Sequence, residues 1–127
     1  MQFKEKKSIF SQIADQICEN IILGIWEEES RIPSVREFSV DIQVNPNTVM
    51  RSYNSLQDKG IIYNKRGIGY FVSTNARMIV INMKKEKFIK NELPELFKTI
   101  QLLGITIDDI GTMYNNYIKG ANNENKQ

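Results

Sequence analysis

The chain has 127 residues, of which 41% are hydrophobic and 25% charged, as in a typical folded globular domain. A chain of this length forms one domain, or a small domain with an appendage, and is too short for a barrel enzyme or a two-domain dehydrogenase. The sequence contains no histidine, which excludes His-based metal sites and Ser-His-Asp triads. Its single cysteine, Cys18, cannot form an internal disulfide. The lone cysteine fits a reducing cytoplasm, where we expect the protein to be. No apolar run approaches the roughly 20 residues that cross a bilayer, so we expect no membrane span.

The formal net charge is only +2, but the charges are unevenly distributed. Residues 31–77 contain seven Lys and Arg against three Asp and Glu, whereas residues 1–30 contain six acids and three bases. A basic middle segment suits a polyanionic partner, although a charge run alone usually means only a solvated helix face.

The first predicted element is an amphipathic helix over residues 8–23. Its apolar side chains recur at every third or fourth position, namely Phe10, Ile13, Ile17 and Ile21. Ser8 or Ser11 would cap its start, and Gly24 fits its end. Cys18 lies beside the apolar stripe and is expected in or near the core.

Two further helices follow with a short turn at residues 43–44. Ser34 and Glu37 have the spacing of a capping box, which predicts a helix start after Pro33. Asn45 followed by Pro46 predicts the next helix start, and this helix would end at Gly60. Phe38 and Ile42 of the first of these helices, and Val49, Tyr53 and Leu56 of the second, would face the core. The pair is a helix-turn-helix pattern.

A β-hairpin is predicted next, because two short β-branched and aromatic runs, 61–63 and 70–72, flank the basic, glycine-containing turn 65–69. Three helices followed by a basic-tipped hairpin have the order of a winged helix-turn-helix domain. We therefore expect a mainly α fold with a small β-hairpin, the winged domain occupying residues 1–75.

The remainder, residues 76–120, is predicted to be a helical segment, with 121–127 as a disordered tail. The run 78–81 is too short to distinguish a strand from a helix. Helical spacing then continues to Gly104, with a kink or a helix start near Pro94. Thr106 and Asp109 would cap a last helix.

The apolar stripe of this helical segment is expected to form a dimer interface. Two helices alone bury little surface, so the stripe would complete itself against a second chain. Its members are Leu93, Leu96, Phe97, Ile100, Leu103, Ile110, Met113, Tyr114 and Tyr117. No residue pattern points to a cofactor, a metal ion or a small-molecule effector.

The candidate functional residues lie on the helix-turn-helix and at the hairpin tip. With the apolar residues inward, the second helix of the pair presents Asn47, Thr48 and Arg51 near its start, where a recognition helix contacts bases. Arg36, in the preceding helix, points to the same side. At the hairpin tip the cations Lys65 and Arg66 precede Gly67, whose missing side chain allows close approach to a phosphate or the minor groove. Each set alone also fits an ordinary solvated surface, but together they favour DNA binding.

These motifs resemble the DNA-binding domain of the GntR family of bacterial repressors over about half the chain. The matching stretches are Gln12-Ile13, Ile21, Gly24, 31–38, 45–49, Arg51, Tyr53, Leu56, 60–62 and 66–72. The resemblance implies DNA contacts by Arg36, by Pro46, Asn47 and Thr48 with Arg51 nearby, and by Arg66 and Gly67 in the wing. Many members carry arginine at the positions of Pro46 and Met50, so recognition here would depend more on Asn47 and Arg51.

The short tail without histidine resembles the YtrA subfamily, whose two-helix tail serves dimerisation. The resemblance implies a homodimeric repressor that binds a pseudo-palindromic DNA operator. The sequence leaves one alternative open, a winged helix that binds a protein partner, although Asn47, Arg51 and Arg66 form no apolar patch. An enzyme is not expected, because no nucleophile and base can be assembled.

Overall fold

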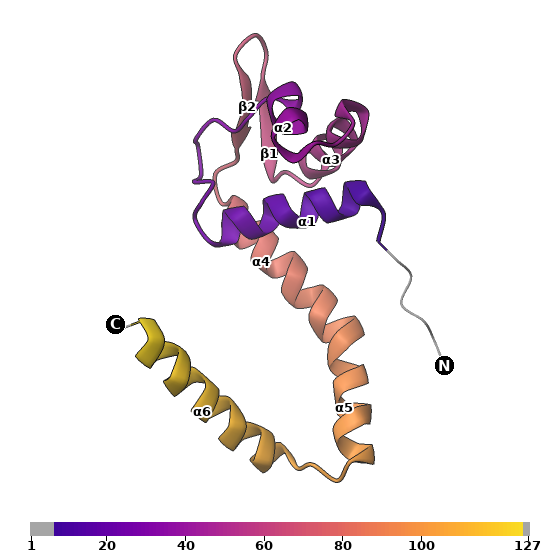
Figure 1. Ribbon diagram of the computed structural model, residues 1–127, viewed down its shortest axis with the longest axis vertical. Coiled ribbons are helices and arrows are strands. Elements are labelled where there is room, and N and C mark those ends of the chain that lie inside the picture. The colour runs from indigo at the N-terminus through magenta and orange to yellow at the C-terminus, as the bar shows by residue number, and fades with distance from the viewer. Residues whose placement is uncertain (1–6, 126–127) are drawn as a thin grey trace. The chain divides into compact units, whose positions relative to one another are not determined.

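The computed structural model describes residues 7–125, which divide between residues 84 and 85 into two compact units (Figure 1). The first unit contains α1 (Ile9–Ile22), α2 (Val35–Ile42), α3 (Pro46–Asp58), the strands β1 (Ile62–Lys65) and β2 (Gly69–Val72), and most of α4 (Ala76–Lys87). This order confirms the winged helix-turn-helix fold. No helix within the described residues is both long enough and apolar enough to cross a bilayer.

The helix starts of the first unit are formed by the side chains that the sequence indicated. Ser8 caps α1, and its hydroxyl accepts a hydrogen bond from the backbone N–H of Ser11. At α2 the Ser34 hydroxyl accepts from the N–H of Glu37 at 3.0 Å, and the Glu37 carboxylate accepts from the N–H of Ser34 at 3.2 Å, completing the capping box. Asn45 caps α3 through a 2.8 Å bond from the N–H of Asn47.

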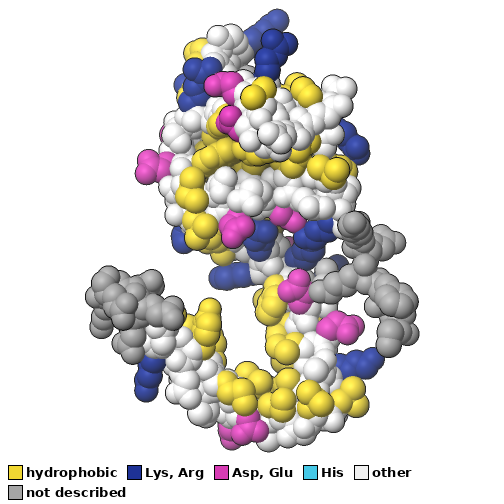
Figure 2. Space-filling model, viewed as in Figure 1, with side chains coloured by type: hydrophobic (Ala, Val, Ile, Leu, Met, Phe, Trp, Pro, Cys, Tyr) yellow, Lys and Arg dark blue, Asp and Glu magenta, His cyan; other side chains and the backbone are white. Residues whose placement is uncertain are grey.

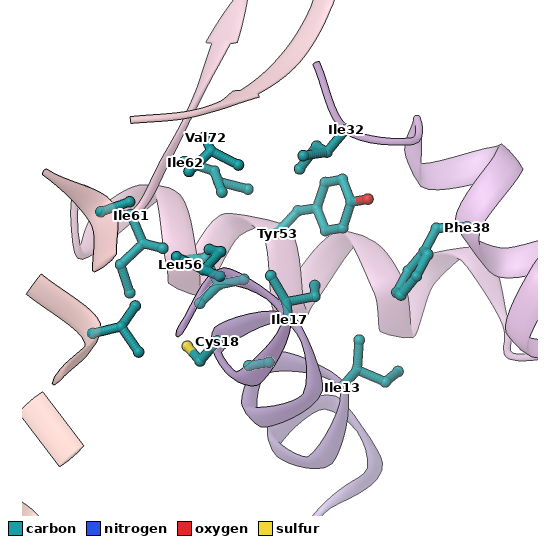
Figure 3. Close-up of a cluster of buried hydrophobic side chains, with 14 of the residues drawn as sticks. Ile13, Ile17, Cys18, Ile32, Phe38, Tyr53, Leu56, Ile61, Ile62 and Val72 are labelled. Carbon is teal, nitrogen blue, oxygen red and sulfur yellow. The ribbon is translucent and has the colours of Figure 1, made fainter. Parts of the chain in front are cut away.

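The core lies between α1, α3 and the hairpin, with Tyr53 at its centre (Figure 3). Tyr53 is fully buried, and its hydroxyl donates to the carbonyl of Pro33 at 2.7 Å, which ties α3 to the start of α2. Burial raises the pKa of this hydroxyl well above its usual value. Cys18 is also buried, and burial raises the pKa of its thiol.

The wing consists of β1, β2 and the turn between them, and a third segment pairs with it. In the hairpin, β1 and β2 pair antiparallel with Lys65 opposite Gly69 and Tyr63 opposite Phe71. On its other edge, β2 hydrogen-bonds to the segment before α2, since the N–H of Ile32 donates to Tyr70 and the N–H of Val72 donates to Ser30. An isolated bridge pairs Arg31 with Phe71. β2 is therefore the middle strand of the wing.

The ambiguous run 78–81 is helical and belongs to α4. Ala76 and Val80 are fully buried in the core of the first unit, so this unit extends to Lys84, beyond the boundary at residue 75 that the sequence indicated. The first turns of α4 complete the hydrophobic core and are not a linker.

The second unit contains a π-helical turn η1 (Phe88–Glu92), then α5 (Leu93–Leu102) and α6 (Ile107–Asn125). Pro94 lies in the first turn of α5, and the N–H of Leu93 donates to the carbonyl of Phe88, five residues back. Proline lacks an N–H and its ring clashes with the carbonyl four residues earlier, so the preceding turn widens.

The start of the last helix, α6, agrees with the sequence-based prediction, but its end does not. Thr106 and Asp109 bond reciprocally at the start of α6, at 3.0 and 3.1 Å, as their spacing predicted. At its other end α6 continues through residues 121–125, which we had expected to be a disordered tail. Residues 126–127 of that expected tail lie outside the described residues.

Candidate nucleic-acid interface

The exposed face of α3 is defined by the residues that α3 buries. Val49, Ser52, Tyr53 and Leu56 face the core, which leaves Asn47 and Arg51 exposed on the opposite side and Thr48 half-buried on one flank. Asn54 is exposed too, one turn after Arg51. Sequence reasoning missed Asn54, although its helical spacing from Asn47 and Arg51 was a sufficient signal.

Arg51 is held by an aromatic ring from α1. Its guanidinium carbon lies 4.2 Å from the ring centroid of Phe10, a cation–π geometry. The two helices are joined at the same place, because the buried hydroxyl of Ser52 donates to the carbonyl of Phe10 at 2.7 Å. Phe10 is half-buried and lies outside the buried core cluster. Its ring is therefore available to orient Arg51.

Arg36 lies in the first turn of α2 and is exposed. It lies between Ser34 and Glu37, whose two reciprocal hydrogen bonds hold the turn that carries it. The N-terminal turn of a helix favours an anion, and an exposed arginine there strengthens that preference.

The wing carries its cations at the tip, where Figure 2 shows Lys and Arg side chains gathered. Lys65 ends β1, and its ammonium lies 4.9 Å from the ring centroid of Phe71. Arg66 and Gly67 form the exposed turn. Gly67 has φ +80°, a left-handed conformation that glycine adopts without strain. Arg36, Lys65, Arg66 and Gly67 are thus all exposed on the first unit.

Arg31 is a basic residue of the same unit that sequence reasoning did not select. Its side chain lies against Gly69 of β2, and its position next to the wing depends on a strand pairing that no local sequence pattern reveals. Only its place in the basic segment hinted at a role.

In the second unit, most of the apolar stripe is exposed on the single chain. Leu96, Phe97, Leu103, Met113, Tyr114 and Tyr117 are exposed by 43% to 71%, whereas Leu93 and Ile110 are half-buried. Ile100 is only 8% exposed, so the chain itself already covers most of this side chain.

Comparison with known proteins matches residues 10–72 to the family described as bacterial regulatory proteins, gntR family. The chain is 33% identical to YhcF of Bacillus subtilis, an HTH-type transcriptional regulator, over 86% of this chain and 88% of that one. It is 34% identical to YtrA of the same organism, an HTH-type transcriptional repressor, over 80% and 78% of the two chains.

A solved structure agrees over nearly the whole length. A transcriptional regulator of the GntR family from Bacteroides thetaiotaomicron superposes with a TM-score of 0.78 at 50% identity, covering 90% of this chain and 99% of that one. The matched family and these relatives are transcriptional regulators and not enzymes, and they carry the DNA-binding domain whose surface is described above.

Proposed function

This chain belongs to the gntR family of bacterial regulatory proteins as a DNA-binding, YtrA-like member, and we propose that it is a cytoplasmic repressor that binds a pseudo-palindromic operator as a homodimer. Bound dimers would exclude RNA polymerase from an overlapping promoter. The proposal on repression follows the named activity of the YtrA relative.

The observation that carries the DNA contacts is the exposed polar face of α3 beside a cationic wing. Asn47 and Arg51 are exposed on α3, which is the element that enters the major groove in a helix-turn-helix protein. Arginine pairs with guanine and asparagine with adenine through two hydrogen bonds each, so these two residues are proposed to read bases. Thr48, on the flank, would contact a phosphate or a thymine methyl group.

The remaining cations are proposed to contact the DNA backbone. Arg36 would bind a phosphate at the start of α2, while Lys65 and Arg66 bring the wing to a flanking phosphate and the minor groove. Gly67 allows the wing backbone to approach the DNA closely. These contacts would set affinity and orientation rather than sequence preference.

The exposed apolar side chains of α5 and α6 support the homodimer. Phe97, Tyr114 and Tyr117 are 48%, 61% and 71% exposed, and large exposed apolar surfaces mark interaction sites. A second copy would cover them in a two-fold arrangement, which places two recognition helices on two half-sites.

Selection of DNA sequences by the full chain, followed by titration of the best site at two salt concentrations, tests this function. Enrichment of a pseudo-palindrome and steep salt dependence are expected. Weak binding with no enriched sequence would contradict the proposal and favour a protein-binding winged helix.

Substitutions separate the two kinds of contact. Arg51→Ala should cost about 1–3 kcal/mol on the operator and relax its sequence preference. Lys65→Ala should weaken operator and random DNA alike and lower the salt slope by about one unit. Lys84→Ala, which removes an exposed cation from α4, is the matched control and should leave both properties unchanged. Equal loss on operator and random DNA for Arg51→Ala would contradict base reading.

A further inference from the structure

The wing presents one face on which two cations flank the middle strand. Residues directly opposite each other in an antiparallel pair share a face, and so do residues two apart on one strand. Lys65 is opposite Gly69, and Arg31 is bridged to Phe71, two residues further along β2. Lys65 and Arg31 therefore lie on the same face, on either side of β2.

Gly69 leaves that face open between the two cations. A Cβ atom placed on Gly69 would lie 3.0 Å from Nε and 3.4 Å from Nη2 of Arg31, so the guanidinium occupies the space that any other side chain would need. Gly69 also has φ +143°, in the region that favours glycine. Arg31 can thus lie across β2 in the direction of Lys65.

The other neighbour of Arg31 is the start of α2. Arg31 lines a surface depression of about 330 Å³ with Ile32, Pro33 and Glu37. Its positive charge contributes to lowering the pKa of the Glu37 carboxyl, after the larger effect of the hydrogen bonds from Ser34. Within the described residues, no hydrogen bond or ion pair engages the guanidinium. Arg31 thus carries an exposed charge beside Glu37 of α2 and over Gly69, which pairs with Lys65.

We propose that Arg31 is a further DNA-contacting residue, which binds a backbone phosphate at the base of the wing between the phosphates held by Arg36 and Lys65. Strand pairing holds the backbone of Arg31, and the bare Gly69 leaves room for its guanidinium over β2, so the charge lies on this face before DNA arrives. The contact carries no sequence information, because it is made to the backbone. This inference rests on the proposed DNA-binding function.

The test is a salt titration of Arg31→Gln on the selected operator and on random DNA. Removing one phosphate contact should reduce the slope of log affinity against log salt by about 0.9. The affinity lost relative to wild type should therefore be about three- to fourfold larger at about 50 mM than at about 200 mM salt, equally on both DNAs. Arg31→Lys keeps the charge and should retain most of the slope.

Lys84→Gln is the matched control, since it removes one positive charge from an exposed site of the same unit, and its slope should remain that of wild type. A wild-type slope for Arg31→Gln would overturn the inference while wild-type binding still upheld the proposed function. Absence of binding by the wild type itself would overturn the function.

If Arg31→Gln does not fold, phosphate-ethylation interference with wild-type protein replaces it. Ethylation of a phosphate between those contacted by Arg36 and by the wing is expected to interfere with binding, and a lack of interference there would refute the assignment.

Discussion

Arg51 illustrates how much of a binding residue's behaviour is set by a partner distant in sequence. Its guanidinium lies 4.2 Å from the centre of the Phe10 ring, and the ring comes from a different helix. A stacked guanidinium has fewer conformations to lose when it pairs with a base, so the ring should raise affinity without touching DNA.

We expect Phe10→Leu to weaken operator binding by about 1 kcal/mol, the size of an exposed cation–π contact, while Phe10→Tyr keeps the ring and binds like wild type. A double-mutant cycle with Arg51→Ala measures the coupling. The Phe10→Leu loss should largely disappear when Arg51 is absent. An undiminished loss in that background would show that Phe10 acts only through folding.

At this scale the sequence predicted which residues are exposed but not how they are held. Helical spacing correctly exposed Asn47 and Arg51, because burial on one helix follows a local period. The Phe10–Arg51 contact and the place of Arg31 beside Gly69 depend on tertiary pairing between segments about 40 residues apart, which a local pattern does not contain.

At the scale of the element, helix starts are where the structure follows the sequence most closely. The reciprocal bonds between Ser34 and Glu37 involve residues three apart, so their formation needs no tertiary partner. Those bonds also lower the pKa of the Glu37 carboxyl.

Ser34→Ala should lower the free energy of unfolding by about 1 kcal/mol, because the N–H of Glu37 loses its acceptor. Ser55→Ala, in the interior of α3, is the control and should have little effect, since alanine favours helix. Chemical denaturation followed by Trp26 fluorescence measures both. An equal loss in the two variants would argue against a capping role.

The acid dependence of the same element has a definite sign. The folded-state pKa of Glu37 is lowered, so its contribution to stability is complete above its ordinary value of 4.5. That contribution disappears as the pH falls through the lowered value, because protonation removes the charged acceptor.

Two elements were not predictable in detail, and each has its own reason. The run 78–81 carries no period of its own, and it becomes helical where Ala76 and Val80 fill the core of the first unit. At Pro94 the sequence indicated a disturbance, but whether the chain kinks, restarts or widens into η1 depends on the backbone of the preceding turn.

At the scale of the whole molecule, the second unit leaves more apolar surface exposed than a single chain would be expected to tolerate. The apolar ring of Phe97 in α5, for example, is 48% exposed to solvent. Because this side chain is exposed in the single chain, a substitution at Phe97 can test self-association separately from folding.

Phe97→Asp should weaken self-association at least about tenfold, or roughly 1.4 kcal/mol, because a carboxylate would be buried without a partner in the proposed dimer. Gln101→Asp introduces the same charge at an exposed polar position of α5 and should cost much less. Sedimentation equilibrium of both variants makes the comparison. Matching association constants for Phe97→Asp and wild type would exclude this face from the dimer interface.

The placement of two rare side chains has a practical consequence. The only cysteine, Cys18, and the only tryptophan, Trp26, both belong to the first unit, where Trp26 packs edge-on against Phe38 at 5.6 Å between ring centroids. Alkylation of the buried thiol requires that unit to open, and indole emission changes when that unit loosens. The unlabelled protein therefore has two reporters in its DNA-binding unit, whereas the second unit has no tryptophan and two tyrosines, Tyr114 and Tyr117. An unfolding curve recorded with either reporter describes the first unit alone, and comparison with a helix-sensitive signal would show whether the two units unfold together.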